Sequence, residues 1–169
     1  MTLQFTIEVL AKTHDRLAFG CGVEVLDRYL KEYVSQDVRR GVTSCYVARP
    51  TDGLRVVGYY TISMGDVPLA DLPRDVARRL PRYPSVPVAR IGRLAVDLTH
   101  RGKGLGGVLL MNAVTRAQRS EIAAYAAVVD AKDENAVAFY RKNGFIRFES
   151  VPQSLFFPLR EFGRRLSKS

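Results

Sequence analysis

The stretch from Arg90 to Gly107, RIGRLAVDLTHRGKGLGG, is the most informative part of the sequence. It starts with an apolar run and continues into a turn that contains four glycines and two cations. The turn opens directly into an apolar helical pattern that begins at Val108. Backbone N–H groups at the start of a helix lie at the positive end of the helix dipole, and glycine lets a bulky anion approach them. The stretch therefore predicts a strand, a phosphate-binding turn and a helix.

The size and composition of the chain are typical of one globular domain, so we predict a single domain over residues 1–169. The longest apolar run, Ile122 to Val129, has eight residues, whereas a membrane-spanning helix needs about 20. We therefore expect a buried strand there and no membrane partner. The N-terminus lacks the pattern of a secretory signal, which predicts a cytoplasmic protein. Cys21 and Cys45 lack metal-ligand spacing, and we expect both to be reduced and no metal to be bound.

The charge is strongly basic, with 26 Lys and Arg residues against 17 Asp and Glu residues and a net charge of +9. Most of the cations are arginines, which bind phosphates through planar bidentate contacts, so the excess indicates an acidic partner. A basic surface that only keeps the protein in solution is the alternative. The densest basic stretch contains Arg74, Arg78, Arg79, Arg82, Arg90 and Arg93.

Hydrophobic periodicity and turn residues predict the order of the elements. The first half is predicted to contain a strand at 5–10, a helix from Leu26 to about Gly41, and a hairpin of strands at 43–49 and 54–64. A proline-rich connection at 68–87 is expected to contain a short helix at 74–80 and no core. The second half is predicted to contain strands at 88–96, 123–130, 145–148 and 155–157, helices at 105–119 and 134–143, and a basic helical tail at 159–169.

The spacing of the glycine turn excludes two common phosphate-binding loops. A P-loop needs Ser or Thr directly after its lysine to hold magnesium, and Lys103 is followed by Gly104. A dinucleotide-binding turn has the spacing Gly-x-Gly-x-x-Gly and follows the first strand of a parallel sheet. Here the spacing is Gly-x-Gly-x-Gly and the turn lies in mid-chain.

The remaining pattern, Arg101-x-x-Gly104-x-Gly106 between a strand and a helix, resembles the acetyl-coenzyme A loop of the GNAT acetyltransferase superfamily. A second motif about thirty residues later resembles the family's helix that ends in Tyr followed by Gly-Phe; it reads Asp133-x-x-Ala136-x-x-Phe139-Tyr140-x-x-x-Gly144-Phe145. The resemblance implies a single GNAT domain of the α/β (α+β) class. Its fold would be a central mixed, twisted sheet of about six to seven strands flanked by about four helices.

The N-terminal half is similar to the TacT-like GNAT toxins. The similarity rests on His14-Asp15, Phe19-x-Cys21-Gly22, Leu26-Asp27-x-Tyr29-Leu30, Gln36 and Val57-Gly58-Tyr59-Tyr60. It implies acetylation of the α-amine of aminoacyl-tRNA, which blocks translation, with acetyl-CoA as co-substrate and no metal. It also implies a homodimer and an antitoxin of the ribbon-helix-helix type.

The resemblance implies a role for each residue of the two motifs. Tyr140 would be the general acid that protonates the departing thiolate. The strand residues Leu94, Ala95 and Val96 would present backbone groups to the pantetheine arm, and Ala136 and Phe139 would also contact the coenzyme. Asp133 is either a coenzyme contact or a helix cap. The pyrophosphate would lie over the backbone of Arg101, Gly102, Lys103, Gly104, Gly106 and Gly107.

The strand at 88–96 contains no glutamate to act as a base, and Asp97 at its end is the one available carboxylate. An α-amine has a reference pKa of about 7.7–8.0, so a substantial fraction of it is neutral near pH 7.5, whereas a lysine amine at about 10.4 is almost fully protonated. The missing base therefore favours an α-amine acceptor. A protein N-terminus or a small amine is the alternative acceptor, and a module that binds coenzyme A or nucleic acid without turnover is the non-enzyme alternative.

The arginines of the basic stretch are candidates for a tRNA phosphate surface, above all Arg78, Arg79, Arg90 and Arg93. Arg90 and Arg93 are separated by an odd number of positions, so a regular strand puts them on opposite faces. His14 and His100 have no carboxylate spacing that suggests catalysis, and we expect both to be structural or exposed to solvent.

Overall fold

The computed structural model describes residues 4–160, and these form two compact units. The first unit comprises residues 4–63 and 92–113, and the second comprises residues 64–91 and 114–160. The strands are β1 (Phe5–Val9), β2 (Ser44–Pro50), β3 (Gly58–Pro68), β4 (Ser85–Val96), β5 (Ala126–Asp130), β6 (Ile146–Arg147) and β7 (Ser154–Pro158). The helices are α1 (Glu24–Arg28), η1 (Tyr29–Tyr33), α2 (Val34–Arg39), α3 (Arg74–Ala77), α4 (Leu105–Arg119) and α5 (Glu134–Lys142), with 3-10 turns at η2 (Leu69–Asp71) and η3 (Leu98–His100).

Within the described residues, the seven strands follow the order β1-β2-β3-β4-β5-β7-β6 in one mixed sheet. The helical segments α1, η1 and α2 follow one another without a break, so four helices accompany the sheet. The mixed α/β class, the strand number and the helix number are confirmed. The single domain over 1–169 stays a prediction. No helix of residues 4–160 combines the length and apolar character needed to cross a bilayer.

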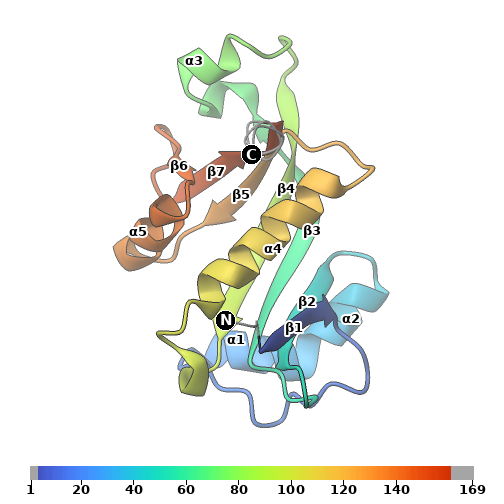
Figure 1. Ribbon diagram of the computed structural model, residues 1–169. Helices are drawn as coiled ribbons and strands as arrows, with labels where there is room; N and C mark the ends of the chain where they lie inside the picture. The colour runs from blue at the N-terminus through green and yellow to red at the C-terminus, as the bar shows by residue number, and fades with distance from the viewer. Residues whose placement is uncertain (1–3, 161–169) are drawn as a thin grey trace. The chain divides into compact units, whose positions relative to one another are not determined.

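The first unit contains the predicted hairpin (Figure 1). Strands β2 and β3 pair antiparallel with Tyr46 opposite Tyr60, and β1 adds to the other edge of β2 with Phe5 opposite Pro50. The core of this unit joins the hairpin to the helix that precedes it through buried side chains, among them Leu30, Val34, Val47 and Tyr59. Both cysteines lie unbridged in this core, as expected.

The predicted helix after residue 26 is confirmed, but its middle, η1, is a π-helical turn. The backbone N–H of Val34 donates to the carbonyl of Tyr29, five residues earlier, instead of to that of Leu30. The carbonyl of Leu30 accepts from Nη1 of Arg16 at 2.9 Å. Because a buried carbonyl without a donor is costly, the arginine stabilises the irregular turn.

In the second unit β4 and β5 are parallel, with Arg90 opposite Val128, and β7 pairs antiparallel with both β5 and β6. The prediction that 68–87 holds no core is wrong. Leu72 and Val86 are 5% and 8% exposed and pack in one cluster with Val67 and Phe156. Strand β3 runs on to Pro68 and β4 begins at Ser85, so the apolar residues between the prolines pack on the strands.

The remaining elements lie close to their predicted positions. Helix α4 has the predicted bounds, and α5 ends one residue before the predicted Asn143. Strand β5 begins at Ala126 instead of 123, and residues 121–123 lie exposed before it. Of the predicted basic tail, residues 161–169 lie outside the described part of the chain.

Candidate functional site

The glycine turn lies in the first unit, between the end of β4 and the start of α4. Asp97 caps the short turn η3, because its Oδ1 accepts hydrogen bonds from the backbone N–H of Thr99 at 3.0 Å and from its hydroxyl at 2.6 Å. Gly102 and Gly104 follow with φ of +75° and +80°. An L side chain rarely adopts this conformation, so both positions require glycine for their backbone geometry.

The turn is open, as a phosphate site requires. A Cβ atom built on Gly102 or Gly104 has no neighbour within 4 Å, which leaves their backbone accessible. Helix α4 starts at Leu105, and the first N–H groups of a helix have no intrahelical acceptor. Those of Leu105, Gly106 and Gly107 are therefore available to bind an anion such as a phosphate. The predicted strand, turn and helix are confirmed, and the ligand roles of residues 101–107 stay predictions.

The base of the turn is fixed to residues 20–21, far away in the sequence. The N–H of Gly20 donates to Oδ2 of Asp97 at 3.0 Å, and the N–H of Leu98 donates to the carbonyl of Gly20 at 2.8 Å. Nη2 of Arg101 donates to the carbonyl of Cys21 at 2.6 Å. The side chain of Arg101 thus holds the turn in place, and its backbone remains the candidate contact for the coenzyme.

Asp97 is not placed to act as a base. It is 2% exposed, and burial alone would raise its pKa, but the hydrogen bonds from Thr99 and Gly20 and the charge of Arg55 outweigh burial and lower the pKa. A carboxylate with a lowered pKa and several donors is a poor proton acceptor. The structure therefore agrees with an acceptor amine that needs no strong base.

The predicted pantetheine residues form the end of β4. Ala95 is buried, and Leu94 and Val96 are half-buried. Helix α4 packs closely against Gly58 of β3. A Cβ atom on Gly58 would lie 2.8 Å from Cδ1 of Leu109 and 3.3 Å from the carbonyl oxygen of Ala95. A glycine at position 58 thus lets the helix approach the strands.

The predicted general acid, Tyr140, lies in the second unit near the C-terminal end of α5. Its ring packs against Phe139 and Phe145, with centroids 5.3 Å and 5.8 Å away. Burial and, to a smaller degree, the negative charge of Asp130 raise the pKa of Tyr140 above 10. The phenol therefore stays protonated at neutral pH, as a general acid must.

Asp133 begins α5 as a helix cap. Its Oδ1 accepts from the N–H of Ala136 at 2.8 Å, which confirms the capping interpretation. At the other end, Gly144 has a φ of +94° and Asn143 donates from Nδ2 to the carbonyl of Phe139 at 2.8 Å. The cap and the C-terminal glycine fix the length of the helix and so the position of Tyr140 on it.

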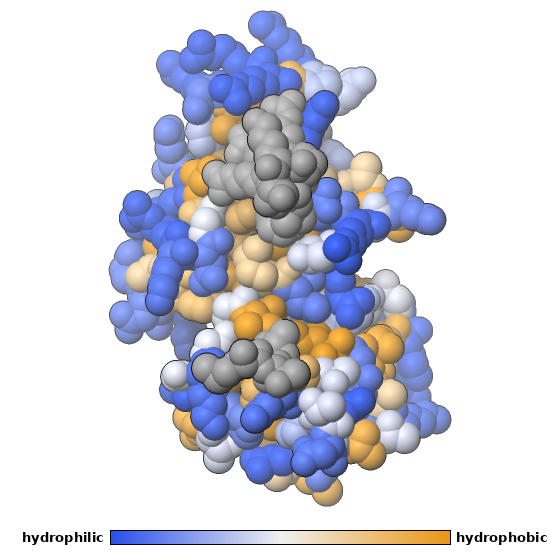
Figure 2. All heavy atoms as spheres, in the orientation of Figure 1, coloured by the Kyte–Doolittle hydropathy of each residue, from blue (hydrophilic) through white to orange (hydrophobic). Residues whose placement is uncertain are grey.

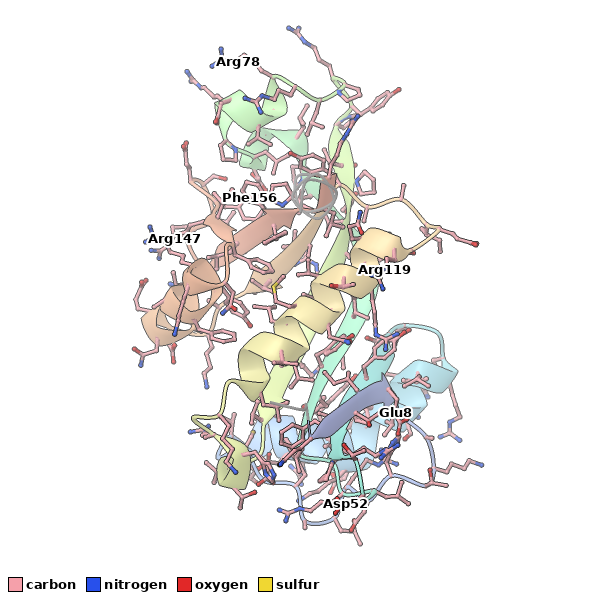
Figure 3. The ribbon with its side chains drawn as sticks, viewed as in Figure 1. Glu8, Asp52, Arg78, Arg119, Arg147 and Phe156 are labelled. Atoms are coloured by element: carbon pink, nitrogen blue, oxygen red, sulfur yellow. The ribbon has the colours of Figure 1, made fainter. Side chains whose placement is uncertain are left out.

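The arginines of the basic stretch have different surroundings. Arg90 pairs with Asp130 at 3.3 Å, whereas the guanidinium of Arg93 lies 3.5 Å from the centroid of the Tyr29 ring. Figure 2 shows hydrophilic side chains over the segment that contains α3, and Figure 3 shows Arg78 beside this helix. The exposed members of this segment are Arg74, Arg78, Arg79 and Arg82.

Three features of the site were not predictable from motifs. The stacking of Arg93 on Tyr29, the bond between Arg101 and Cys21, and the contact of Gly20 with Asp97 all join residues more than sixty positions apart. The histidines are structural, as predicted: His14 is buried beside Glu8, and His100 bonds to Thr99. Among residues 4–160, no group of three or more His, Cys, Asp or Glu side chains is arranged to hold a metal ion.

Comparison with known families identifies the fold. The model of the acetyltransferase (GNAT) family matches residues 12–145, which include the glycine turn and Tyr140. The chain belongs to the GNAT family. This GNAT protein is 31% identical over 155 residues to the probable toxin TacT of Sinorhizobium fredii (strain NBRC 101917 / NGR234), and the match covers 86% of both chains.

Two further relatives of this GNAT protein carry more specific descriptions. It is 37% identical over 133 residues to the tRNA-acetylating toxin of Mycobacterium tuberculosis (strain ATCC 25618 / H37Rv), with 78% of each chain covered. Among solved structures, AtaT complexed with acetyl-methionyl-tRNAfMet superposes with a TM-score of 0.89 at 29% identity, covering 96% of this chain and 99% of AtaT. The resemblance inferred from the motifs is thus confirmed along nearly the whole chain.

Proposed function

We propose that this GNAT protein transfers the acetyl group of acetyl-CoA to the α-amine of aminoacyl-tRNA and so blocks translation. The observation that carries the proposal is the open glycine turn before α4, in a chain 37% identical to a tRNA-acetylating toxin. The names of both relatives support the role of a toxin, and a cognate antitoxin of the ribbon-helix-helix type remains our expectation. A homodimer and a cytoplasmic location belong to the same proposal.

The chemistry assigns a distinct task to Tyr140. In acetyl transfer the acceptor nitrogen forms a bond to the acetyl carbon and gives up one proton to solvent, and the C–S bond of the thioester breaks. The coenzyme thiolate then takes a proton from Tyr140, whose phenol regains one from solvent. The raised pKa of Tyr140 keeps a proton on its phenol for this last step. A substantial fraction of an α-amine is neutral near pH 7.5, so this amine can attack although Asp97 is engaged in hydrogen bonds and does not act as a base.

The arginine-rich segment supports a nucleic acid as the acceptor. Arg74, Arg78, Arg79 and Arg82 are exposed, and the whole chain carries a net charge of +9. Phosphate contacts from arginines supply much of the affinity of a protein for nucleic acid. A protein N-terminus also presents an α-amine, but it offers no phosphates to these arginines.

An acetyl-transfer assay tests the proposal. The protein is incubated with labelled acetyl-CoA and total tRNA, either charged or stripped of amino acid, and the label on tRNA is counted. We expect label on charged tRNA alone. Tyr140→Phe should lower the rate by about 100-fold or more, in the range typical of a lost general acid.

Tyr33→Phe is the matched control, because it removes an exposed phenol from the first unit and should leave the rate unchanged. Label on a protein N-terminus or on a small amine instead of charged tRNA would contradict the proposal. So would a Tyr140→Phe variant with the wild-type rate.

A further inference from the structure

Arg93 differs in its partner from three other half-buried arginines. Arg49 pairs with Glu8, Arg55 with Asp97 and Arg90 with Asp130. Within residues 4–160 Arg93 forms no ion pair, and its guanidinium lies over the ring of Tyr29 instead, 3.5 Å from the centroid. A cation–π contact orients a guanidinium without neutralising its charge. Arg93 is therefore an oriented cation that has no counter-ion among the described residues.

The ring under Arg93 is itself held firmly. Tyr29 is 6% exposed, and its hydroxyl donates to Oδ2 of Asp37 at 2.8 Å. Burial and the bond to Asp37 raise the pKa of Tyr29 to about 12, so the hydroxyl remains a donor at neutral pH. The ring cannot turn away without breaking this bond.

The π turn sets the position of Tyr29 in the helix. The turn starts at Tyr29, whose carbonyl accepts from the N–H of Val34. Groups outside the helix stabilise this irregular segment: Tyr59 donates to the carbonyl of Leu26 at 2.7 Å, and Arg16 donates to that of Leu30. A π turn costs regular hydrogen bonds and is often found at functional sites, which suggests that the placement of Tyr29 has a use.

The stacked geometry suits a phosphate. The N–H groups of a guanidinium lie in its plane, so stacking on a ring leaves its edge able to form two parallel bonds to phosphate oxygens. A side chain that is already ordered also loses less conformational entropy when it binds. Arg93 directly precedes Leu94, Ala95 and Val96, the predicted backbone contacts of the acetyl carrier.

We infer that Tyr29 is a positioning residue that holds Arg93 as the receptor for a phosphate of the tRNA acceptor end. This inference rests on the proposed function and names a contact of its substrate. The phosphates of the coenzyme are the other possible source of the same chemistry. The open glycine turn already provides a site for them, so we assign Arg93 to the tRNA.

Steady-state kinetics separate the two sources. Tyr29→Leu removes the ring and should raise the KM for aminoacyl-tRNA about five- to tenfold, with kcat and the KM for acetyl-CoA unchanged. Tyr29→Phe keeps the ring and should stay within about twofold of wild type. Arg93→Lys keeps the charge but loses the planar stack on Tyr29. It should reproduce the effect of Tyr29→Leu even if Tyr29→Leu folds poorly.

Three results of these kinetic measurements would contradict the inference. An equal rise in the KM for acetyl-CoA would assign Arg93 to the coenzyme and overturn the inference. An unchanged KM for both substrates in Arg93→Lys would show that the stack is only structural. A Tyr29→Phe variant as impaired as Tyr29→Leu would show that the hydroxyl, and not the ring face, carries the effect.

A binding measurement without catalysis distinguishes this inference from the proposed function. The Nε–H resonance of Arg93, identified by its loss in Arg93→Lys, should be shifted by the Tyr29 ring and should move again when deacylated tRNA is added. If deacylated tRNA moves the resonance but charged tRNA is never acetylated, the proposed function fails and the contact between Arg93 and tRNA stands. If charged tRNA is acetylated but the resonance does not respond to tRNA, the inference fails alone.

Discussion

At the scale of single residues, Glu8 makes the stability of the first unit depend on pH. Its Oε1 accepts from Nε of Arg49 at 2.5 Å and from Nε2 of His14 at 2.8 Å, and Figure 3 shows Glu8 on β1. His14 carries its hydrogen on Nε2, because Nδ1 accepts from the N–H of Ala11. The bond from Arg49 and then that from His14 lower the pKa of Glu8 below 4.5.

A group whose pKa is lowered by folding stabilises the folded state when it is ionised. This stability is present above the pKa of Glu8 in the unfolded chain and is lost as the pH falls through its lower folded value. We therefore expect the midpoint of urea unfolding to fall between about pH 5 and about pH 3, and Glu8→Gln to flatten this fall. Asp52→Asn, in an exposed turn of the same unit, should leave the wild-type pH dependence intact. A Glu8→Gln profile parallel to wild type would contradict the assignment.

The sequence could predict which residues form the glycine turn, but it could not predict which distant residues form hydrogen bonds to it. The positions of Gly102 and Gly104 follow from local backbone geometry, which a motif records. The partners of Asp97 and Arg101 lie at Gly20 and Cys21, almost eighty positions away. No periodicity links such distant positions, so Asp97 was available as a base in the sequence and is a structural cap in the fold.

At the scale of elements, predictability followed the strength of the local pattern. The bounds of helix α4 were predicted, because a glycine turn marks its start and apolar residues repeat along it. The π turn was missed, because one extra residue in a turn leaves the spacing of Leu26, Leu30 and Val34 compatible with a regular α-helix. The buried residues of 68–87 were missed because five prolines interrupt every periodic pattern there.

Because Arg16 bonds to the π turn, we expect its replacement to lower the free energy of unfolding more than replacement of an exposed arginine does. Its Nη1 donates to the carbonyl of Leu30 at 2.9 Å and to Oγ of Ser35 at 3.0 Å, so Arg16→Met leaves a buried carbonyl without its donor. We expect the free energy of unfolding to fall by about 2 kcal/mol, the usual cost of losing a charge-assisted hydrogen bond. Urea denaturation at neutral pH measures the change.

Arg28→Met is the matched control for this experiment. Arg28 lies on the helical segment that leads into the π turn, is exposed, and forms only an i,i+4 pair with Glu32 at 3.2 Å among the described residues. Exposed pairs of this kind contribute about 0.5 kcal/mol or less. Equal losses in the two variants would show that the carbonyl of Leu30 finds another donor and that Arg16 does not stabilise the turn.

At the scale of the whole molecule, two separated motifs and the order of the elements were enough to predict the family and the fold class. They could not predict the acceptor surface, because a motif for coenzyme binding contains no information about the second substrate. The net charge of +9 indicates the chemistry of that substrate but not where it binds. Arg78 and Arg79 are therefore candidates by exposure, and their role has to be measured.

The salt dependence of tRNA binding measures that role directly. Each phosphate contact that is lost lowers the slope of log Kd against log salt concentration by about 0.7–0.9. If both arginines bind phosphates, Arg78→Gln with Arg79→Gln should lower the slope by about 1.5 between about 50 and 200 mM salt. Lys12→Gln with Lys31→Gln removes the same charge from exposed positions of the first unit and should leave the slope unchanged. Equal reductions would show that net charge, and not the segment around α3, attracts the tRNA.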